Sequence, residues 1–210
     1  MAGLFGPDGK VNLALGVVKN LMVLGVLALV CCLPVVTIGA SLTALSYVAH
    51  RIARNEEGYI TKDFFRAFRE SFKPATVIWL MMLVLIAFFS MDLYIFKYTD
   101  AQFPDFMKIV IVVALVALLL VMTYMFPMIA RFQNTVKGYL KNGLMMTLLN
   151  LPKAILMLVL YALPSVIGGY FYELMPLVLI FGLSLPAWLS AKLVYGKYFL
   201  GLVEKIEKSR

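Results

Sequence analysis

The stretch CCLPVVTIGAS, residues 31–41, interrupts a long apolar segment with a proline, a threonine, a glycine and a serine. The uncharged segment around it runs from Asn20 to Ala49. A straight helix of that length would measure about 45 Å, which is too long for one crossing of a bilayer and marginal for two. The sequence therefore predicts that the helix is broken inside the quoted stretch.

Pro34 marks the break, because proline lacks a backbone N–H and disfavours helical backbone at the preceding residue. Gly39 permits a turn, and Ser41 or Thr37 can cap the helix that follows. Small residues also let helices approach closely, and hydroxyl groups hydrogen-bond between helices in lipid. We interpret the stretch as a helix break and packing hub rather than a substrate site. Its candidate residues are Pro34, Thr37, Gly39, Ser41 and Thr43.

We predict a first helix over residues 13–33, a break over residues 34–39 and a second helix over residues 40–54. Two arrangements remain open. A bent helix that crosses the bilayer places the N-terminus outside, whereas a re-entrant hairpin places it inside. Lys10 and Lys19 join the outer basic residues in the first arrangement and the inner ones in the second.

The composition indicates an integral membrane protein. Hydrophobic residues make up 63% of the chain and charged residues only 14%, which excludes an ordinary soluble domain. The uncharged runs are Asn20–Ala49, Pro74–Met91, Ile109–Ala130, Ala154–Tyr172 and Leu174–Ala191. They must be helical, because lipid offers no partners to open strand edges. We expect a single multi-span domain over residues 1–210: a compact all-α bundle of about five hydrophobic helices, the first bent or re-entrant near Pro34 to Gly39.

The basic residues predict the orientation of the chain. Residues 51–73, 131–153 and the C-terminal tail from Lys192 hold 15 of the 19 Lys and Arg residues. Basic connections remain on the cytoplasmic side of a membrane, so we expect these segments and the C-terminus to be cytoplasmic in a bacterial cell membrane. The net charge of +8 then faces an anionic inner leaflet, and no nucleic-acid partner is needed to explain it.

The first cytoplasmic connection has an amphipathic pattern. In GYITKDFFRAFRESFKPA, residues 58–75, four phenylalanines recur at helical spacing among basic residues, and Pro74 can open the span that follows. The pattern predicts an interfacial helix that lies on the inner leaflet or docks to a partner. The residues of this candidate surface are Phe64, Phe65, Arg66, Phe68, Arg69, Phe72 and Lys73.

A second amphipathic segment is RFQNTVKGYLKNGLMMTLLNLPKA, residues 131–154. Pro152 again precedes a span, and we expect a second cytoplasmic interfacial helix. The apolar residues of its predicted stripe lie four apart: Phe132, Val136, Leu140, Leu144 and Leu148.

Two blocks of the chain resemble a known family. The blocks are LPVVTIGASLTALSYVAHRIARNEEGYITKDFFRAFRESFKPATVIWL, residues 33–80, and FPMIARFQNTVKGYLKNGLMMTLLNLPKAIL, residues 126–156. They resemble the YesL-like bacterial membrane proteins, and the resemblance runs along nearly the whole chain. It implies a small multi-span protein associated with bacterial carbohydrate-uptake systems, without established catalytic residues.

Residues with catalytic or ligand chemistry are scarce. His50, the single histidine, lies beside Arg51, and we interpret it as a solvated interfacial side chain. We interpret Cys31 and Cys32 as small apolar side chains within the first apolar run. The chain has no phosphate loop, zinc-helix motif or nucleophile elbow. We therefore expect no enzyme activity, no catalytic or metal-binding residues and no cofactor.

Two functions are compatible with these observations. The first is an accessory or interaction subunit that docks to a sugar-importer permease of the ABC type or to a sensor protein. The second is a transport component whose discontinuous helices line a solute pathway. The discontinuities expected for it are residues 34–39, 164–169 and 182–186.

Single-cysteine labelling tests the predicted orientation. A membrane-impermeant thiol reagent applied to intact cells should label Gln102→Cys and leave Arg69→Cys and Lys208→Cys unlabelled, because the basic segments are cytoplasmic. Labelling of Arg69→Cys or Lys208→Cys, without labelling of Gln102→Cys, would overturn the orientation.

Overall fold

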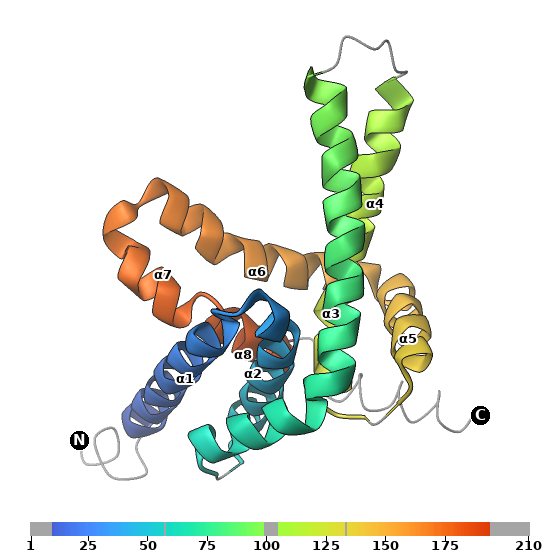
Figure 1. The fold of residues 1–210 in the computed structure, drawn as a ribbon. Coiled ribbons are helices and arrows are strands. Elements are labelled where there is room, and N and C mark those ends of the chain that lie inside the picture. Colours follow the sequence, from blue (N-terminus) through green and yellow to red (C-terminus); the bar gives the residue numbers. More distant parts are fainter. Residues whose placement is uncertain (1–9, 57, 99–104, 133, 194–210) are drawn as a thin grey trace.

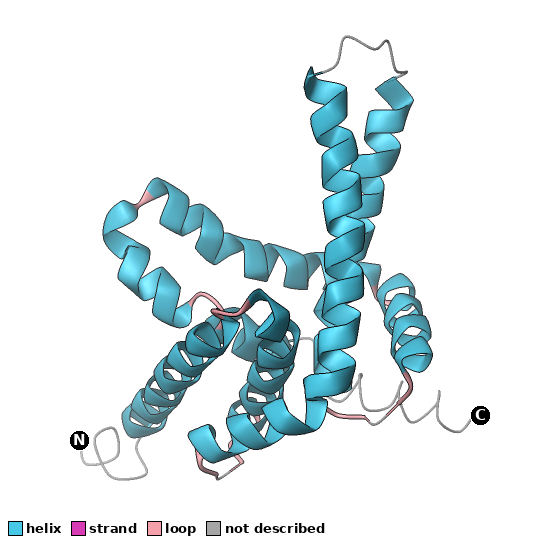
Figure 2. Cartoon of the chain, viewed as in Figure 1, coloured by secondary structure: helices cyan, strands magenta, loops and turns pink. Residues whose placement is uncertain are grey.

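The computed structural model describes residues 10–56, 58–98, 105–132 and 134–193, and nearly all of them are helical (Figures 1 and 2). No strand occurs among these residues. Short 3-10 turns at Val35–Thr37 and Tyr172–Leu174 precede α2 and α7. The helices are α1 Lys10–Cys32, α2 Ile38–Ala53, α3 Ile60–Tyr98, α4 Asp105–Ile129, α5 Val136–Leu149, α6 Leu151–Tyr170, α7 Met175–Phe181 and α8 Ser184–Leu193. The predicted all-α fold is confirmed.

Five segments of the described chain are long and apolar enough to cross a membrane. They are Ala14–Cys32, Val35–Ala53, Ile60–Phe96, Phe106–Ile129 and Leu151–Tyr170. A further candidate is a broken pair, Tyr172–Phe181 and Ser184–Leu193, which is bent by 57°. The bend falls at Gly182 and Leu183, where the sequence predicts a discontinuity. The chain is thus a multi-pass membrane protein.

Helices α1 and α2 fold back on one another at the predicted break (Figure 1). Helix α1 ends at Cys32 and α2 begins at Ile38. Leu24 of α1 and Leu45 of α2 are fully buried in the same core cluster. The break is therefore confirmed, and it takes the form of a hairpin.

Hydroxyl groups near the break bind carbonyl groups at the end of α1. Thr37 Oγ1 donates to the carbonyl oxygens of Cys31 at 2.6 Å and Pro34 at 2.8 Å. Ser41 Oγ donates to the carbonyl oxygen of Ala28 at 3.0 Å. The predicted capping of α2 by these side chains is wrong: Thr37 occupies the N-cap position, but its side chain makes no cap bond. Both hydroxyls bind the chain that enters the break instead.

Gly39 lies inside α2 without a positive φ, so its predicted role in a turn is wrong. It provides space for α3, because a Cβ atom at Gly39 would lie 2.5 Å from Trp79 Cβ and 2.6 Å from the carbonyl oxygen of Ala75. Trp79 Nε1 also donates to the carbonyl oxygen of Val35 at 2.8 Å. Thr43 Oγ1 donates to the carbonyl oxygen of Gly39, one turn earlier, at 2.8 Å. The predicted packing hub thus joins three helices.

The α1–α2 hairpin reaches only half-way along α3 (Figure 1). Its tip binds Trp79, and residues 80–98 of α3 continue about 28 Å further. Residues 80–91 are uncharged, so α3 remains apolar beyond the tip. Leu33 and Val35 at the tip are 81% and 56% exposed, which suits hydrocarbon and not water. The two helices therefore form a hairpin with an apolar tip, and each of them is also long and apolar enough to cross a membrane.

Helix α3 is continuous from Ile60 to Tyr98, so the predicted interfacial segment is not a separate helix. Pro74 lies inside α3 and does not open a new span, and the helix changes direction early in its length (Figure 1). The bond lost at proline belongs to the carbonyl group of Glu70, an exposed residue where water can replace it. Beyond the proline, the buried residues Ala75 and Ile78 hold the helix against its neighbours.

Helix α5 corresponds to the second amphipathic segment. Thr135 caps it, and its Oγ1 accepts a hydrogen bond from the N–H of Gly138 at 3.2 Å. The predicted stripe is only partly correct, because Leu144 and Leu148 are exposed. A spacing of four residues drifts around a helix that has 3.6 residues per turn. The buried face of α5 consists of Gly138, Tyr139, Gly143, Met146 and Thr147.

Helix α6 contains two prolines, of which the first was expected to precede the span and the second to break it. Pro152 lies in its first turn, as expected. The helix then continues through Pro164 to Tyr170, so the predicted break over residues 164–169 is wrong. Gly168 serves packing instead, because a Cβ atom there would lie 3.3 Å from Cγ1 of Val178 in α7.

The core has two parts that meet at the start of α3. One part contains Leu24, Leu45 and Phe64 from α1, α2 and α3, together with α8. The other contains Tyr124 and other residues of α3, α4, α5 and α6. Phe68 packs against both parts. The first turns of α3 are therefore packed inside the protein and help to form its core. The assignment of residues 1–210 to one domain remains a prediction.

The close contact at Gly39 can be tested by adding one methyl group. Gly39→Ala should lower the free energy of unfolding by about 1–3 kcal/mol, because the new Cβ atom meets the backbone of α3. Gly16→Ala is the matched control, since no atom lies within 4 Å of that Cβ position. The control should be neutral or stabilising by about 0.5–1 kcal/mol. Denaturant unfolding in detergent measures both, and equal stabilities would contradict the packing role.

Candidate functional site

The connection between α2 and α3 reverses the chain within a few residues. Asn55 has a φ of 55°, a left-handed conformation that asparagine tolerates better than most residues. The N–H of Asn55 donates to the carbonyl oxygen of Ile52, and the N–H of Glu56 donates to that of Arg51, both at 3.1 Å. This pattern ends α2 and returns Glu56 to the side of Arg51.

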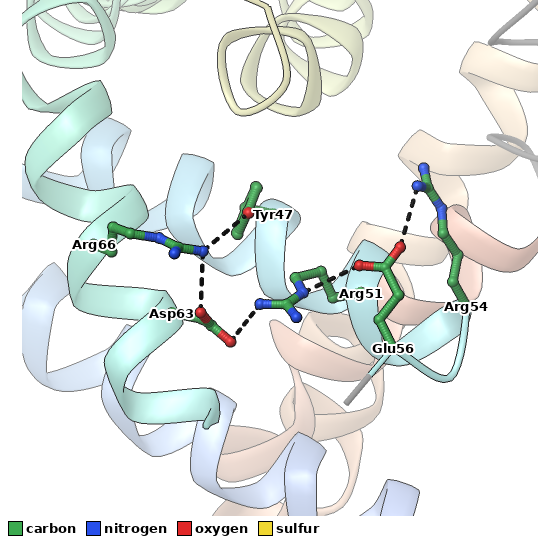
Figure 3. A network of polar contacts seen from close by, with 6 residues as sticks. All are labelled: Tyr47, Arg51, Arg54, Glu56, Asp63 and Arg66. Atoms are coloured by element: carbon green, nitrogen blue, oxygen red, sulfur yellow. Dashed lines mark hydrogen bonds and ion pairs between the residues drawn. The ribbon is translucent and has the colours of Figure 1, made fainter. Parts of the chain in front are cut away.

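A chain of ion pairs crosses this connection (Figure 3). Arg51 lies at its centre, with Nη1 2.5 Å from Asp63 Oδ2 and Nε 3.1 Å from Glu56 Oε2. Glu56 Oε1 also lies 3.4 Å from Arg54 Nη1, and Asp63 Oδ1 lies 3.1 Å from Arg66 Nη2. The five charged side chains therefore link the end of α2 to the first turns of α3.

The Arg51–Asp63 pair is the most shielded part of this network. Its side chains are 22% and 13% exposed, and Asp63 lies in the first turn of α3, where the helix dipole favours a negative charge. Gly58 leaves room for the pair, because a Cβ atom there would lie 2.6 Å from Asp63 Oδ2. Arg66 Nη2 also donates to the hydroxyl oxygen of Tyr47 at 3.3 Å. These contacts fix the direction in which α3 leaves α2.

The structure exposes only part of the predicted partner or lipid surface. Phe64 is fully buried, so the prediction that its ring enters lipid or a partner groove is wrong. Phe68 and Phe72 are half-buried against the core, so only part of each ring is free to contact lipid or a partner. The phenylalanine stripe faces α2 and the core because the start of α3 is packed inside the protein. We call the exposed remainder the α3 basic face; it consists of Phe65, Arg66, Arg69 and Lys73.

His50 is buried and not solvated, which corrects the sequence-based interpretation. Its Nδ1 atom lies 2.6 Å from the carbonyl oxygen of Ser46, one turn earlier in α2. Helix α2 packs against α1, α3, α4 and α8, and this packing covers the last turn.

Two cavities with charged and polar lining residues flank the junction. The first has a volume of about 380 Å³ and lies between α1 and the α2–α3 connection. Asn12 at the start of α1 and Arg51 at the end of α2 both line it, so the two ends of the hairpin lie on the same side. The second has a volume of about 360 Å³ and lies between α2, α3, the end of α4 and the start of α5. Arg131 and Glu70 are its charged lining residues.

Sequence reasoning missed the Arg51–Asp63 pair and both cavities. The pair was detectable in principle, because opposite charges flank a short connection that contains Asn55 and Gly58. The cavities could not be detected in the sequence, because they depend on how α1, α4 and α5 pack around the junction.

A family model described as "Protein of unknown function, DUF624" matches residues 17–93. This segment includes the whole network of Figure 3, the α1–α2 break and most of α3. No similarity to a curated protein or to a solved structure was found. The match links the first three helices to an uncharacterised family, and the narrower YesL-like resemblance stays a prediction.

A double-mutant cycle tests the junction. The variants Arg51→Gln and Asp63→Asn should show a coupling energy of about 1–3 kcal/mol, because the pair is shielded and removal of one partner leaves the other charge partly buried. Arg54→Gln and Glu56→Gln form the matched control, whose exposed pair should couple by less than about 1 kcal/mol. Unfolding in detergent gives both values. Similar coupling in the two pairs would remove the special role of Arg51 and Asp63.

Proposed function

We propose that this protein is a non-enzymatic accessory or interaction subunit of the bacterial cytoplasmic membrane. It docks through the α3 basic face to a carbohydrate-uptake permease of the ABC type or to a sensor protein. The observation that carries this proposal is the construction of α3, in which an exposed basic surface and a membrane span belong to one continuous helix.

A continuous helix makes the basic face a defined surface. Arg69 and Lys73 are exposed, while Phe64 on another side of the same helix is fully buried. The Arg51–Asp63 pair holds the first turn of α3 against α2. A partner therefore meets a surface that is ordered before it binds, which lowers the entropy cost of association.

The expected partner follows from orientation and resemblance. The hairpin geometry brings Lys10 and Lys19 to the side of residues 51–73, which strengthens the charge bias in favour of a cytoplasmic location. The YesL-like resemblance supports carbohydrate uptake as the process. The family description of residues 17–93 assigns no function.

A transport component is the alternative function. The re-entrant α1–α2 hairpin and the bent α7–α8 pair are discontinuous helices of the kind that line solute pathways. A cavity of about 250 Å³ between α2, α4, α6 and the α7–α8 turn is mainly apolar, with Ser46 and Thr123 among its lining residues. Its apolar lining favours packing over passage of a sugar.

Partner capture separates the docking surface from a general attraction to lipid. Arg69→Gln with Lys73→Gln should reduce recovery of a co-purifying permease or sensor roughly tenfold, because interfacial charge pairs contribute on the order of 1 kcal/mol or more each. The level of the variant in the membrane should not change, since each charge contributes only about 1 kcal/mol of attraction to an anionic surface.

The matched control is Lys137→Gln with Lys141→Gln on α5, which removes two exposed positive charges from another basic segment that we expect on the cytoplasmic side. It should leave partner recovery unchanged. Equal losses in both double variants would indicate attraction to lipid alone. An isolated protein that moves a labelled sugar across liposomes would favour the transport alternative.

A further inference from the structure

The cavity between α3 and α5 is a polar space in a largely apolar molecule. It has a volume of about 360 Å³, and residues from four separate segments line it. Tyr47 belongs to α2, Ser71 and Pro74 to α3, Ile129 to α4 and Tyr139 to α5. None of the four residues of the α3 basic face lines this cavity, so it is distinct from the proposed docking surface.

Arg131 contributes a positive group to this cavity, and it has no ion-pair partner among the residues that the structure describes. Its Nη1 atom is buried and has no hydrogen-bond partner among the described residues. A buried guanidinium nitrogen without an acceptor is costly, because water no longer solvates it and nothing replaces the water. Such a group in a native fold indicates a missing partner, and the chemistry of guanidinium favours an oxyanion.

The segment around Arg131 is held in place before any ligand binds. The hydroxyl of Tyr139 donates to the carbonyl oxygen of Phe132 and accepts from the N–H of Asn134 at 2.9 Å. Asn134 Oδ1 in turn accepts from the N–H of Thr135 at 2.8 Å. These bonds tie the α4–α5 connection to α5, so Arg131 is presented on an ordered backbone.

The cavity lies where two helices pass from apolar to polar sequence. Pro74 begins the uncharged part of α3, and Ile129 ends the uncharged part of α4. Both positions are on the side of the molecule that carries the basic connections. This is the depth at which phospholipid phosphates lie in a bilayer.

We propose that this cavity binds the phosphate group of an anionic phospholipid, with the Arg131 guanidinium as its main ligand. Charge-assisted hydrogen bonds from the guanidinium bind the phosphate oxygens. The remainder of the lipid extends along the apolar surfaces of α3 after Pro74 and of α4 before Ile129.

Glu70 separates this proposal from a simple internal ion pair. It lines the same cavity, yet no ion pair joins it to Arg131 among the described residues. If Arg131 binds phosphate, the carboxylate of Glu70 opposes binding, and Glu70→Gln should preserve or raise affinity. If Arg131 instead pairs with Glu70, Glu70→Gln should destabilise the fold as Arg131→Gln does.

Native mass spectrometry of the purified full chain in detergent tests the site, with dioleoyl phosphatidylglycerol as the probe. Arg131→Gln should weaken lipid binding about tenfold or more, because it removes charge-assisted hydrogen bonds. Arg131→Lys should retain part of the binding, since the charge remains without the forked geometry. Lys141→Gln, an exposed charge on α5, should bind like the wild type.

Competition identifies the source of the phosphate. If the lipid chains contribute to binding, soluble glycerol phosphate at millimolar concentration should displace little phosphatidylglycerol. Full displacement would assign the site to a soluble phosphate compound and overturn the lipid proposal. Thermal unfolding without added lipid checks the folding of each variant. Wild-type affinity in a folded Arg131→Gln variant, or loss of both binding and stability in Glu70→Gln, would also overturn it.

Discussion

Carbonyl groups at the break after α1 need hydrogen-bond donors from the protein, because lipid supplies none. Thr37 and Ser41 supply two of these donors, and the indole of Trp79 supplies a third to Val35. The donors come from the connection, from α2 and from the middle of α3. The hydrogen bonds to the free carbonyl groups of this one break therefore hold three helices together.

The same three helices determine the polar side of the molecule. Because α1 and α2 run in opposite directions, Asn12 returns to the level of Arg51. The pairing of Arg51 with Asp63 then sets the start of α3, and α3 continues from this charged junction into the membrane as one helix. The packing of α1, α2 and α3 therefore determines both the core around the hairpin and the surface that we assign to a partner.

Local rules predicted the features that depend on a few neighbouring residues. Pro34 indicated the break because the loss of one backbone donor is a local property, and composition indicated the long helices. The role of Gly39 depended on Ala75 and Trp79, which lie far along the chain, so the sequence suggested a turn where the structure has a helix contact.

Phe64 and Phe65 are neighbours of equal hydrophobicity, yet only the fold determines that one is fully buried and the other exposed. Pro164 failed as a signal because a helix in lipid tolerates the single backbone bond that a proline removes, and α6 continues through it.

We infer from the hairpin that the α1–α2 connection ends inside the hydrocarbon layer, with the outer ends of both helices on one side. A nitroxide spin label at Val36, an exposed apolar position at the tip, measures this directly in lipid nanodiscs of the protein with Cys31 and Cys32 replaced by alanine. We expect molecular oxygen, which concentrates in lipid, to broaden the spectrum of the label strongly and a water-soluble nickel chelate to leave it unchanged. Strong broadening by the nickel chelate would place the tip in water and contradict the re-entrant hairpin.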